Sequence, residues 1–225
     1  MSPRRKPART TLPPRDVLLP AVYEAIRPHL LPHFLAAKRW RRLALGQDAT
    51  LVFENREIVL FHLHERLRAE GVTDARRRAD LVAEHERLLP RPYQLRASLF
   101  IDGADRRRGA LLAQRMTGSR SPISLLVGAC RVRGDIVEPM ASAVHYITFD
   151  LRAATRVLAR GAVSLSVGLA FDAGASQTPL DPLTTERLLQ DLLASERVAA
   201  RRHPFQQYTC SNDILNGDFH ARETA

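Results

Sequence analysis

Three groups of histidines and carboxylates carry the residue types that bind metal ions. They are His62-Leu-His64-Glu65, Glu84-His-Glu86 and His145. On a helix, His62 and His64 point to opposite sides, because residues two apart are separated by about 200°, so they cannot both bind one ion. His62 and Glu65 lie three residues apart and share a face. Imidazole and carboxylate groups bind zinc and other transition metals, so His62, Glu65, His85 and His145 are candidate ligands of a metal-dependent enzyme.

The same residues also fit a structural role, because surface histidines are common and this spacing matches no metal-binding signature. In that interpretation the two histidines at 62 and 64 are polar positions on a partly buried helix, and the acids pair with arginines one turn away. The sequence contains none of the patterns GxxxxGK[ST], GxGxxG, HExxH, GxSxG and CxxC. The structural role is therefore favoured over the metal site.

A second candidate site is the segment Phe53-Glu-Asn-Arg56, which we expect at a junction between a strand and a helix. The junction brings together an acid, an amide, a guanidinium and the free N–H groups of a helix start, which bind anions. A helix cap is the alternative: Asn55 would accept hydrogen bonds from the first turn, while Glu54 and Arg56 would pair with each other or join neighbouring elements. Glu54, Asn55 and Arg56 are thus candidates for binding an anion or a partner.

The segment Lys38-Arg-Trp-Arg-Arg42 places one aromatic residue among four cations. Such a group can stack on a base or bind phosphates. The alternative is that Trp40 is buried as part of the core while the cations point into solvent. We include Lys38, Arg39, Trp40, Arg41 and Arg42 among the candidates for binding an anion or a partner.

The formal net charge is +10, which would suit a polyanionic partner if the charge were gathered on one face. Part of it lies in the first 15 residues, where Arg4, Arg5, Lys6, Arg9 and Arg15 meet no acid before Asp16. Such a basic segment can contact phosphates. The arginine runs at 76–78 and 106–108 have acidic neighbours, and they predict solvated helix faces.

These residues are expected to be positioned by a single α+β domain over residues 16–193, with a mainly antiparallel sheet and helices packed on one side. Residues 1–15 are basic and proline-rich and predict a disordered arm. Residues 194–225 predict the end of a helix and an irregular tail. We find no export signal and no apolar run of the roughly 20 residues that a membrane helix needs, so we expect a cytoplasmic protein without membrane contact.

Hydrophobic periodicity gives the order of the elements. Strands are expected at 42–45 and 50–53, 95–101, 123–127, 131–137, 143–150 and 162–168. Helices are expected at 55–70, 73–89, 105–116 and 152–160, and a last helix starts at 181–185 and carries the leucines of 188–193. Pro28 and Pro32 are expected to interrupt a helix that starts near Val22. The segment Gly174-Ala-Ser-Gln-Thr178 predicts a loop.

Four segments of the chain resemble a bacterial family that is catalogued as a domain of unknown function. They are Tyr23-Glu-Ala-Ile-Arg27, Leu51-Val-Phe-Glu-Asn-Arg56, Leu88-Leu-Pro90 with Leu95 to Ile101, and Val144-His-Tyr-Ile-Thr-Phe149. Genes of that family often lie beside genes for rubrerythrin-like and iron-sulfur oxidoreductase proteins, so the resemblance implies an accessory part in redox or oxidative-stress physiology. The chain departs from the family at His62 and His64, where the family tends to carry glutamines.

Three functions therefore stand as expectations. The first is a non-enzymatic accessory or interaction protein of a redox system, whose partner would be a rubrerythrin-like or iron-sulfur oxidoreductase protein. The second is a protein that binds a small anion or nucleic acid through a basic surface. The third and weakest is a metal-dependent enzyme. The sequence identifies no cofactor, substrate or catalytic residue.

Overall fold

The computed structural model describes residues 11–47, 49–101, 106–116, 121–137, 144–159, 161, 163–171 and 174–197. Their strands join in one eight-stranded sheet in which every neighbouring pair is antiparallel. The strands are β1 (Arg42–Leu45), β2 (Ala49–Glu54), β3 (Gln94–Ile101), β4 (Ile123–Val127), β5 (Cys130–Ile136), β6 (Val144–Asp150), β7 (Leu165–Phe171) and β8 (Gly174–Pro179). The expected α+β domain with an antiparallel sheet is confirmed.

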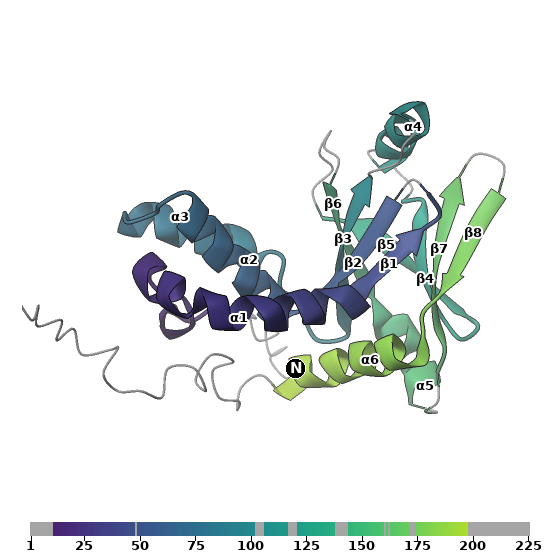
Figure 1. The fold of residues 1–225 in the computed structure, drawn as a ribbon. Helices are drawn as coiled ribbons and strands as arrows, with labels where there is room; N and C mark the ends of the chain where they lie inside the picture. Colours follow the sequence, from purple (N-terminus) through teal and green to yellow (C-terminus); the bar gives the residue numbers. More distant parts are fainter. Residues whose placement is uncertain are drawn as a thin grey trace, which may run out of the picture.

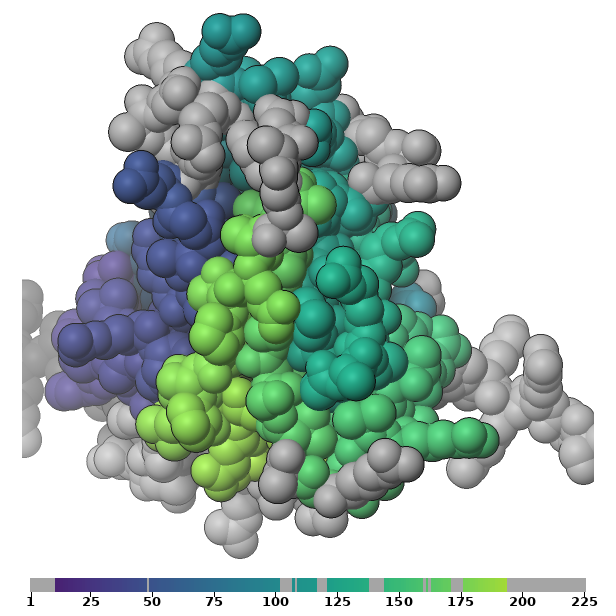
Figure 2. Space-filling model, turned by 90° about the vertical axis from the view of Figure 1, so that its right-hand side faces the viewer, coloured from purple at the N-terminus to yellow at the C-terminus, as the bar shows by residue number. Residues whose placement is uncertain are grey.

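The sheet curls into a nearly closed barrel. Its strand order is β1-β2-β3-β6-β5-β4-β7-β8, and the two edge strands β1 and β8 approach each other. Figure 2 shows the blue surface of β1 and β2 next to the light green surface of β8. Alternate residues of each strand point into the barrel, where apolar side chains such as Leu51, Phe53, Ala97, Ile147 and Phe149 form the core.

Helices cover one side and both ends of the barrel (Figure 1). They are η1 (Pro14–Asp16), α1 (Pro20–Arg41), α2 (Arg56–Ala69), α3 (Ala75–Glu86), α4 (Arg106–Met116), η2 (Leu151–Ala154), α5 (Thr155–Leu158) and α6 (Pro182–Arg197). Leu112 and Met116 of α4 enter the core from one end, and Leu188 and Leu192 of α6 enter it from the other. No helix in the described ranges is both long enough and apolar enough to cross a bilayer.

The helices α1, α2 and α3 extend away from the barrel, and we call them the helical arm (Figure 1). The arm has its own apolar core. Tyr23, Ile26, Leu30 and Phe34 recur at helical spacing on α1 and are buried against α2. The rings of Phe34 and Phe61 stack with their centroids 4.4 Å apart. The strands β2, β3 and β6 form the side of the barrel next to this arm.

The prediction that Pro28 and Pro32 interrupt the first helix is wrong, because α1 runs through both. Each proline removes one i→i−4 hydrogen bond. Both are exposed, as is Glu24, whose carbonyl would otherwise be bonded by residue 28, so water can reach the affected turns. Burial of the apolar stripe on the opposite face offsets the local loss.

Two segments that were expected to be irregular are ordered. Residues 11–15 pack on the arm: Leu12 is only 3% exposed, and its N–H donates to Glu86 Oε1 at 2.8 Å. The segment 174–178, expected as a loop, lies in β8 and pairs with β7. An edge strand needs only one partner, so small and polar residues suffice there. Residues 1–10 and 198–225 of the expected arm and tail lie outside the described residues.

Candidate functional site

The last residue of β2, Glu54, is a buried carboxyl group on the outer face of the barrel. Phe53 points into the core, so its neighbour Glu54 points outward, and yet Glu54 is only 5% exposed. Its Oε1 accepts a hydrogen bond from Ser98 Oγ at 2.6 Å. Its Oε2 is buried and has no hydrogen-bond partner among the described residues. Burial raises the pKa of Glu54, although Ser98 and the charges of Lys38 and Arg41 oppose the shift.

Glu54 belongs to a row of polar residues that crosses three strands. In the sheet register Glu54 lies opposite Arg96, and Arg96 lies opposite Thr148. We call Glu54, Arg96 and Thr148 the cross-strand row. Each contributes a buried atom without a hydrogen-bond partner in the described part of the chain, namely Oε2, Nε and Oγ1. Buried polar atoms are nearly always hydrogen-bonded, so three neighbouring exceptions mark a place that water or a ligand would complete.

Arg96 supplies a positive charge to this row. Its Nη1 donates to the backbone oxygen of Arg87, and within the described ranges no carboxylate pairs with it. Burial, together with the charge of Arg91, lowers the pKa of Arg96 to about 10. The side chain therefore stays cationic at neutral pH, and none of the described carboxylates forms an ion pair with it.

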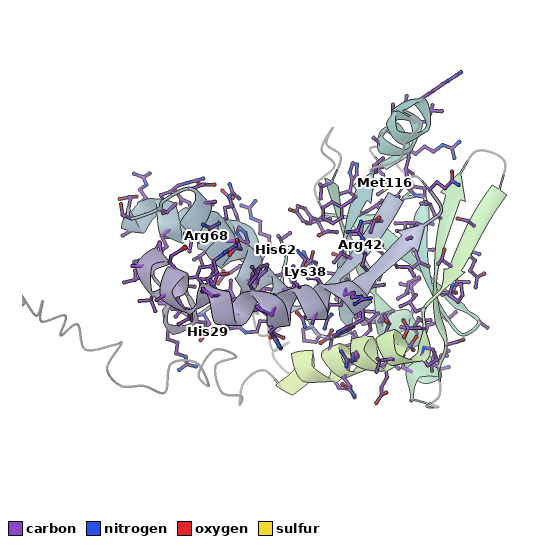
Figure 3. All side chains as sticks on the ribbon, in the orientation of Figure 1. His29, Lys38, Arg42, His62, Arg68 and Met116 are labelled. Carbon is purple, nitrogen blue, oxygen red and sulfur yellow. The ribbon has the colours of Figure 1, made fainter. Side chains whose placement is uncertain are left out.

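Lys38 brings a second cation from the last turn of α1. Its Nζ lies 2.9 Å from His62 Nε2 and above the ring of Phe61, 5.8 Å from the centroid. Figure 3 shows Lys38 and His62 side by side at the base of the arm. Burial, then the charges of Lys38 and His85, lowers the pKa of His62 to about 4. His62 is therefore neutral and accepts a hydrogen bond from the Lys38 ammonium.

An ion pair between buried Arg41 and partly buried Asp191 joins α1 to α6. Arg41 is 4% exposed, and its Nη2 lies 2.7 Å from Asp191 Oδ2. Asn55 Nδ2 donates to Asp191 Oδ1 at 3.4 Å, while Asn55 Oδ1 accepts from Ile58 N at 2.9 Å. The prediction that Asn55 caps α2 is confirmed. Burial raises the pKa of Asp191, against the opposing charge of Arg41.

The segment Lys38–Arg42 does not form one continuous basic surface. Arg41 is buried, whereas Arg39 and Arg42 are exposed. Trp40 is half-buried, and the guanidinium carbons of Arg41 and Arg187 lie over its ring, 4.6 Å and 4.1 Å from the centroid. The ring of Trp40 already stacks on two protein cations, so this arrangement disfavours stacking on a base.

Arg56 holds the N-terminal segment against α2. Its Nη1 donates to Thr11 O at 2.9 Å, and its Nη2 forms an ion pair with Asp16. The expected alternative of a pair between Glu54 and Arg56 is wrong, because the strand points Glu54 toward Ser98. Arg56 instead joins neighbouring elements, the other role considered for it.

The metal-ligand candidates already have other partners. Glu65 accepts hydrogen bonds from Arg27 Nε at 2.6 Å and from Tyr23 Oη at 2.7 Å. His85 Nδ1 lies 2.8 Å from Leu81 O. His145 lies on the same inward face of β6 as the core residues Ile147 and Phe149, and it is buried. In the ranges that the structure covers, no three His, Cys, Asp or Glu side chains are placed to share one metal ion.

Sequence reasoning missed Ser98, Arg96, Thr148 and Asp191. The alternation along β3 marks Arg96 and Ser98 as positions off the core face. That pattern cannot show that β2 pairs beside them, and Asp191 is 136 residues from its hydrogen-bond partner Asn55. Only the register and the packing of α6 bring these side chains to the junction that the sequence singled out.

Comparison with known proteins gives a family model and a fold. A model described as "Protein of unknown function (DUF3501)" matches residues 11–192. No curated protein matches the chain significantly. The crystal structure of a novel protein of unknown function from Burkholderia pseudomallei has a TM-score of 0.72 and 24% sequence identity, covering 81% of this chain and 100% of that chain. At this level of identity, the similarity to the Burkholderia pseudomallei structure concerns the fold alone.

Proposed function

Because the chain belongs to the DUF3501 family of proteins of unknown function, we propose a function from its own residues: it binds a small oxyanion between Lys38 and Arg96, on the outer face of the barrel. One observation carries the proposal. In the described part of the chain, two half-buried cations form no ion pair, and the paired strand residues Glu54, Arg96 and Thr148 each hold a buried polar atom without a hydrogen-bond partner.

The chemistry of these groups favours an anion that has several oxygens. Burying a cation without a counter-charge is unfavourable, and a bound phosphate or carboxylate would remove that cost. A guanidinium binds two oxygens of such a group at once, and an ammonium adds a point charge. The Thr148 hydroxyl can donate a further hydrogen bond. Because Glu54 and Ser98 are almost wholly buried, only a small ligand would reach them.

Calorimetric titration with sulfate, inorganic phosphate, succinate and citrate at low ionic strength tests the proposal. We expect Arg96→Gln and Lys38→Gln each to weaken binding about tenfold or more, because a hydrogen bond to a charged group contributes about 1.5–3 kcal/mol. Arg76→Gln is the matched control, since Arg76 is exposed on α3. The absence of binding for all four anions, or an equal loss in the control, would contradict the proposal.

The family resemblance supports a second proposal, an accessory role beside a rubrerythrin-like or iron-sulfur oxidoreductase protein. A pull-down from nuclease-treated native extract, with mass spectrometry of the captured proteins, tests it. Reproducible recovery of such an oxidoreductase is the expected result, and its absence from repeated experiments argues against the role. Nucleic-acid binding receives less support, because Arg41 and Trp40 are engaged within the protein.

A further inference from the structure

The next inference rests on the proposed function and concerns the proton at its site. We propose that Glu54 binds the oxyanion as a neutral acid, so that Oε2–H donates a hydrogen bond to the ligand and each ligand is bound together with one proton. The proton comes from solvent and stays on Glu54 while the anion is bound. No other covalent bond forms or breaks.

The hydrogen bonds around Glu54 leave only one of its oxygens available. Oε1 already accepts from Ser98, whereas Oε2 is buried and lies in the cross-strand row beside Arg96. Because Glu54 and Arg96 are paired residues of neighbouring strands, an oxyanion that accepts from the unpartnered Nε of Arg96 would approach Oε2. Two negatively charged oxygens repel each other strongly where water is excluded. A proton on Oε2 turns that repulsion into a short, charge-assisted hydrogen bond.

The charged groups near Glu54 come from several elements. Lys38 and Arg41 of α1 favour its ionised form, and Arg96 of β3 lies opposite it in the register. Asp191 of α6 is paired with Arg41. Burial outweighs Ser98, Lys38 and Arg41 and raises the pKa of Glu54, so the carboxyl group takes up a proton more readily than an exposed glutamate.

The neighbouring imidazole is not the group that takes up this proton. The pKa of His62 is lowered to about 4, first by burial and then by Lys38. An anion bound beside Lys38 would have to reverse a large shift before His62 became charged. Proton uptake by Glu54 needs only a further rise of its pKa, which burial already raises.

Sulfate is a suitable probe because it does not itself take up a proton near neutral pH. Calorimetry of sulfate binding in three buffers of different ionisation enthalpy, at about pH 7, gives the number of protons taken up per ligand. We expect a value near one for the wild-type protein, and an affinity that rises up to tenfold for each unit of decreasing pH above the pKa of Glu54 in the free protein.

Two variants identify the group. Glu54→Gln supplies an amide N–H in place of Oε2–H, so it should bind sulfate without proton uptake and with a flat pH profile. Glu57→Gln removes a partly exposed acid of the first turn of α2 and should keep the wild-type uptake. If a variant fails to fold, the buffer series on the wild-type protein still shows whether one proton is taken up with each sulfate.

Sulfate binding without proton uptake in the wild-type protein, or unchanged uptake in Glu54→Gln, would overturn the inference and leave the proposed function standing. Loss of sulfate binding in a folded Glu54→Gln would also overturn it, because the amide offers the same donor. If the wild-type protein binds neither sulfate nor any of the other three anions, the proposed function and this inference fail together.

Discussion

Glu54 destabilises the folded protein at neutral pH, because a buried carboxylate loses its hydration. Ser98 and two cations recover part of this loss, yet the pKa of Glu54 remains above its ordinary value of 4.5. The folded state therefore holds the proton more tightly than the unfolded state. The stabilisation from this proton is complete below 4.5 and disappears as the pH rises through the raised folded pKa.

Glu54→Gln should remove this pH dependence. We expect the free energy of unfolding of the variant, relative to the wild-type protein, to be larger at pH 8 than at pH 5, because the wild-type protein loses the stabilisation from its proton as the pH rises through the raised pKa of Glu54. Urea denaturation at the two pH values measures the difference. Glu57→Gln serves as the control. A relative stability that is constant, or that falls with rising pH, would show that Glu54 is ionised without penalty.

At the scale of elements, the start of α2 depends on one amide side chain. Asn55 accepts a hydrogen bond from Ile58 N and donates one to Asp191, so it caps α2 and joins it to α6. Asn55→Ala should lower the free energy of unfolding by about 1 kcal/mol, as loss of a cap does, with a further loss if the contact with Asp191 contributes. Urea denaturation measures the change.

Asn55→Ser separates these two contributions, because serine keeps the cap but is too short to replace the amide contact. A stability close to that of the wild-type protein would assign the loss to the cap. A loss as large as that of Asn55→Ala would assign it to the link with α6. No loss in either variant would contradict a structural role for Asn55.

Local patterns in the sequence predict those elements whose signal is local. The cap at Asn55, the hairpin of β1 and β2 and the alternation along β3 follow from neighbouring residues. The continuity of α1 through Pro28 and Pro32 does not follow from neighbouring residues, because burial of an apolar stripe more than ten residues long outweighs the hydrogen bonds that the two prolines remove. β8 escapes prediction because its order comes from pairing with β7 rather than from its composition.

The candidate site is only partly predictable for the same reason. The residues 54–56 stand out in the sequence by their chemical types, but nothing local says which way each points. Glu54 accepts a hydrogen bond from Ser98 and lies opposite Arg96 only because β2 pairs with β3 in one register. A shift by one residue would turn Glu54 into the barrel core. The site therefore depends on contacts between distant segments.

At the scale of the whole molecule, α6 connects the barrel to the helical arm. Its apolar residues Leu188 and Leu192 enter the barrel core. Its other contacts reach the end of α1: Thr184 Oγ1 donates to Trp40 O at 2.7 Å, and Asp191 pairs with Arg41. Since Lys38 belongs to the arm and Arg96 to the barrel, α6 helps to fix the two cations of the proposed site relative to each other.

The ion pair between Arg41 and Asp191 should therefore behave as a coupled unit. Arg41→Met leaves a partly buried acid without its cation, and Asp191→Leu leaves a buried guanidinium. We expect Asp191→Leu to lower the free energy of unfolding by about 3–5 kcal/mol, and Arg41→Met to lower it by less because water reaches part of Asp191. The double variant removes both charges and fills their space with apolar atoms. Its loss should be well below the sum of the single losses, because neither charge then remains buried alone.

Urea denaturation of the four proteins gives the coupling energy, and sulfate affinity of the double variant tests the consequence for the site. If α6 positions the arm mainly through this pair, the double variant should be stable yet bind sulfate more weakly than the wild-type protein. Additive losses would show that the two side chains act independently. Unchanged sulfate affinity would mean that apolar packing of α6, together with the bond from Thr184 to the backbone of α1, is sufficient to hold the end of α1 with Lys38 in place.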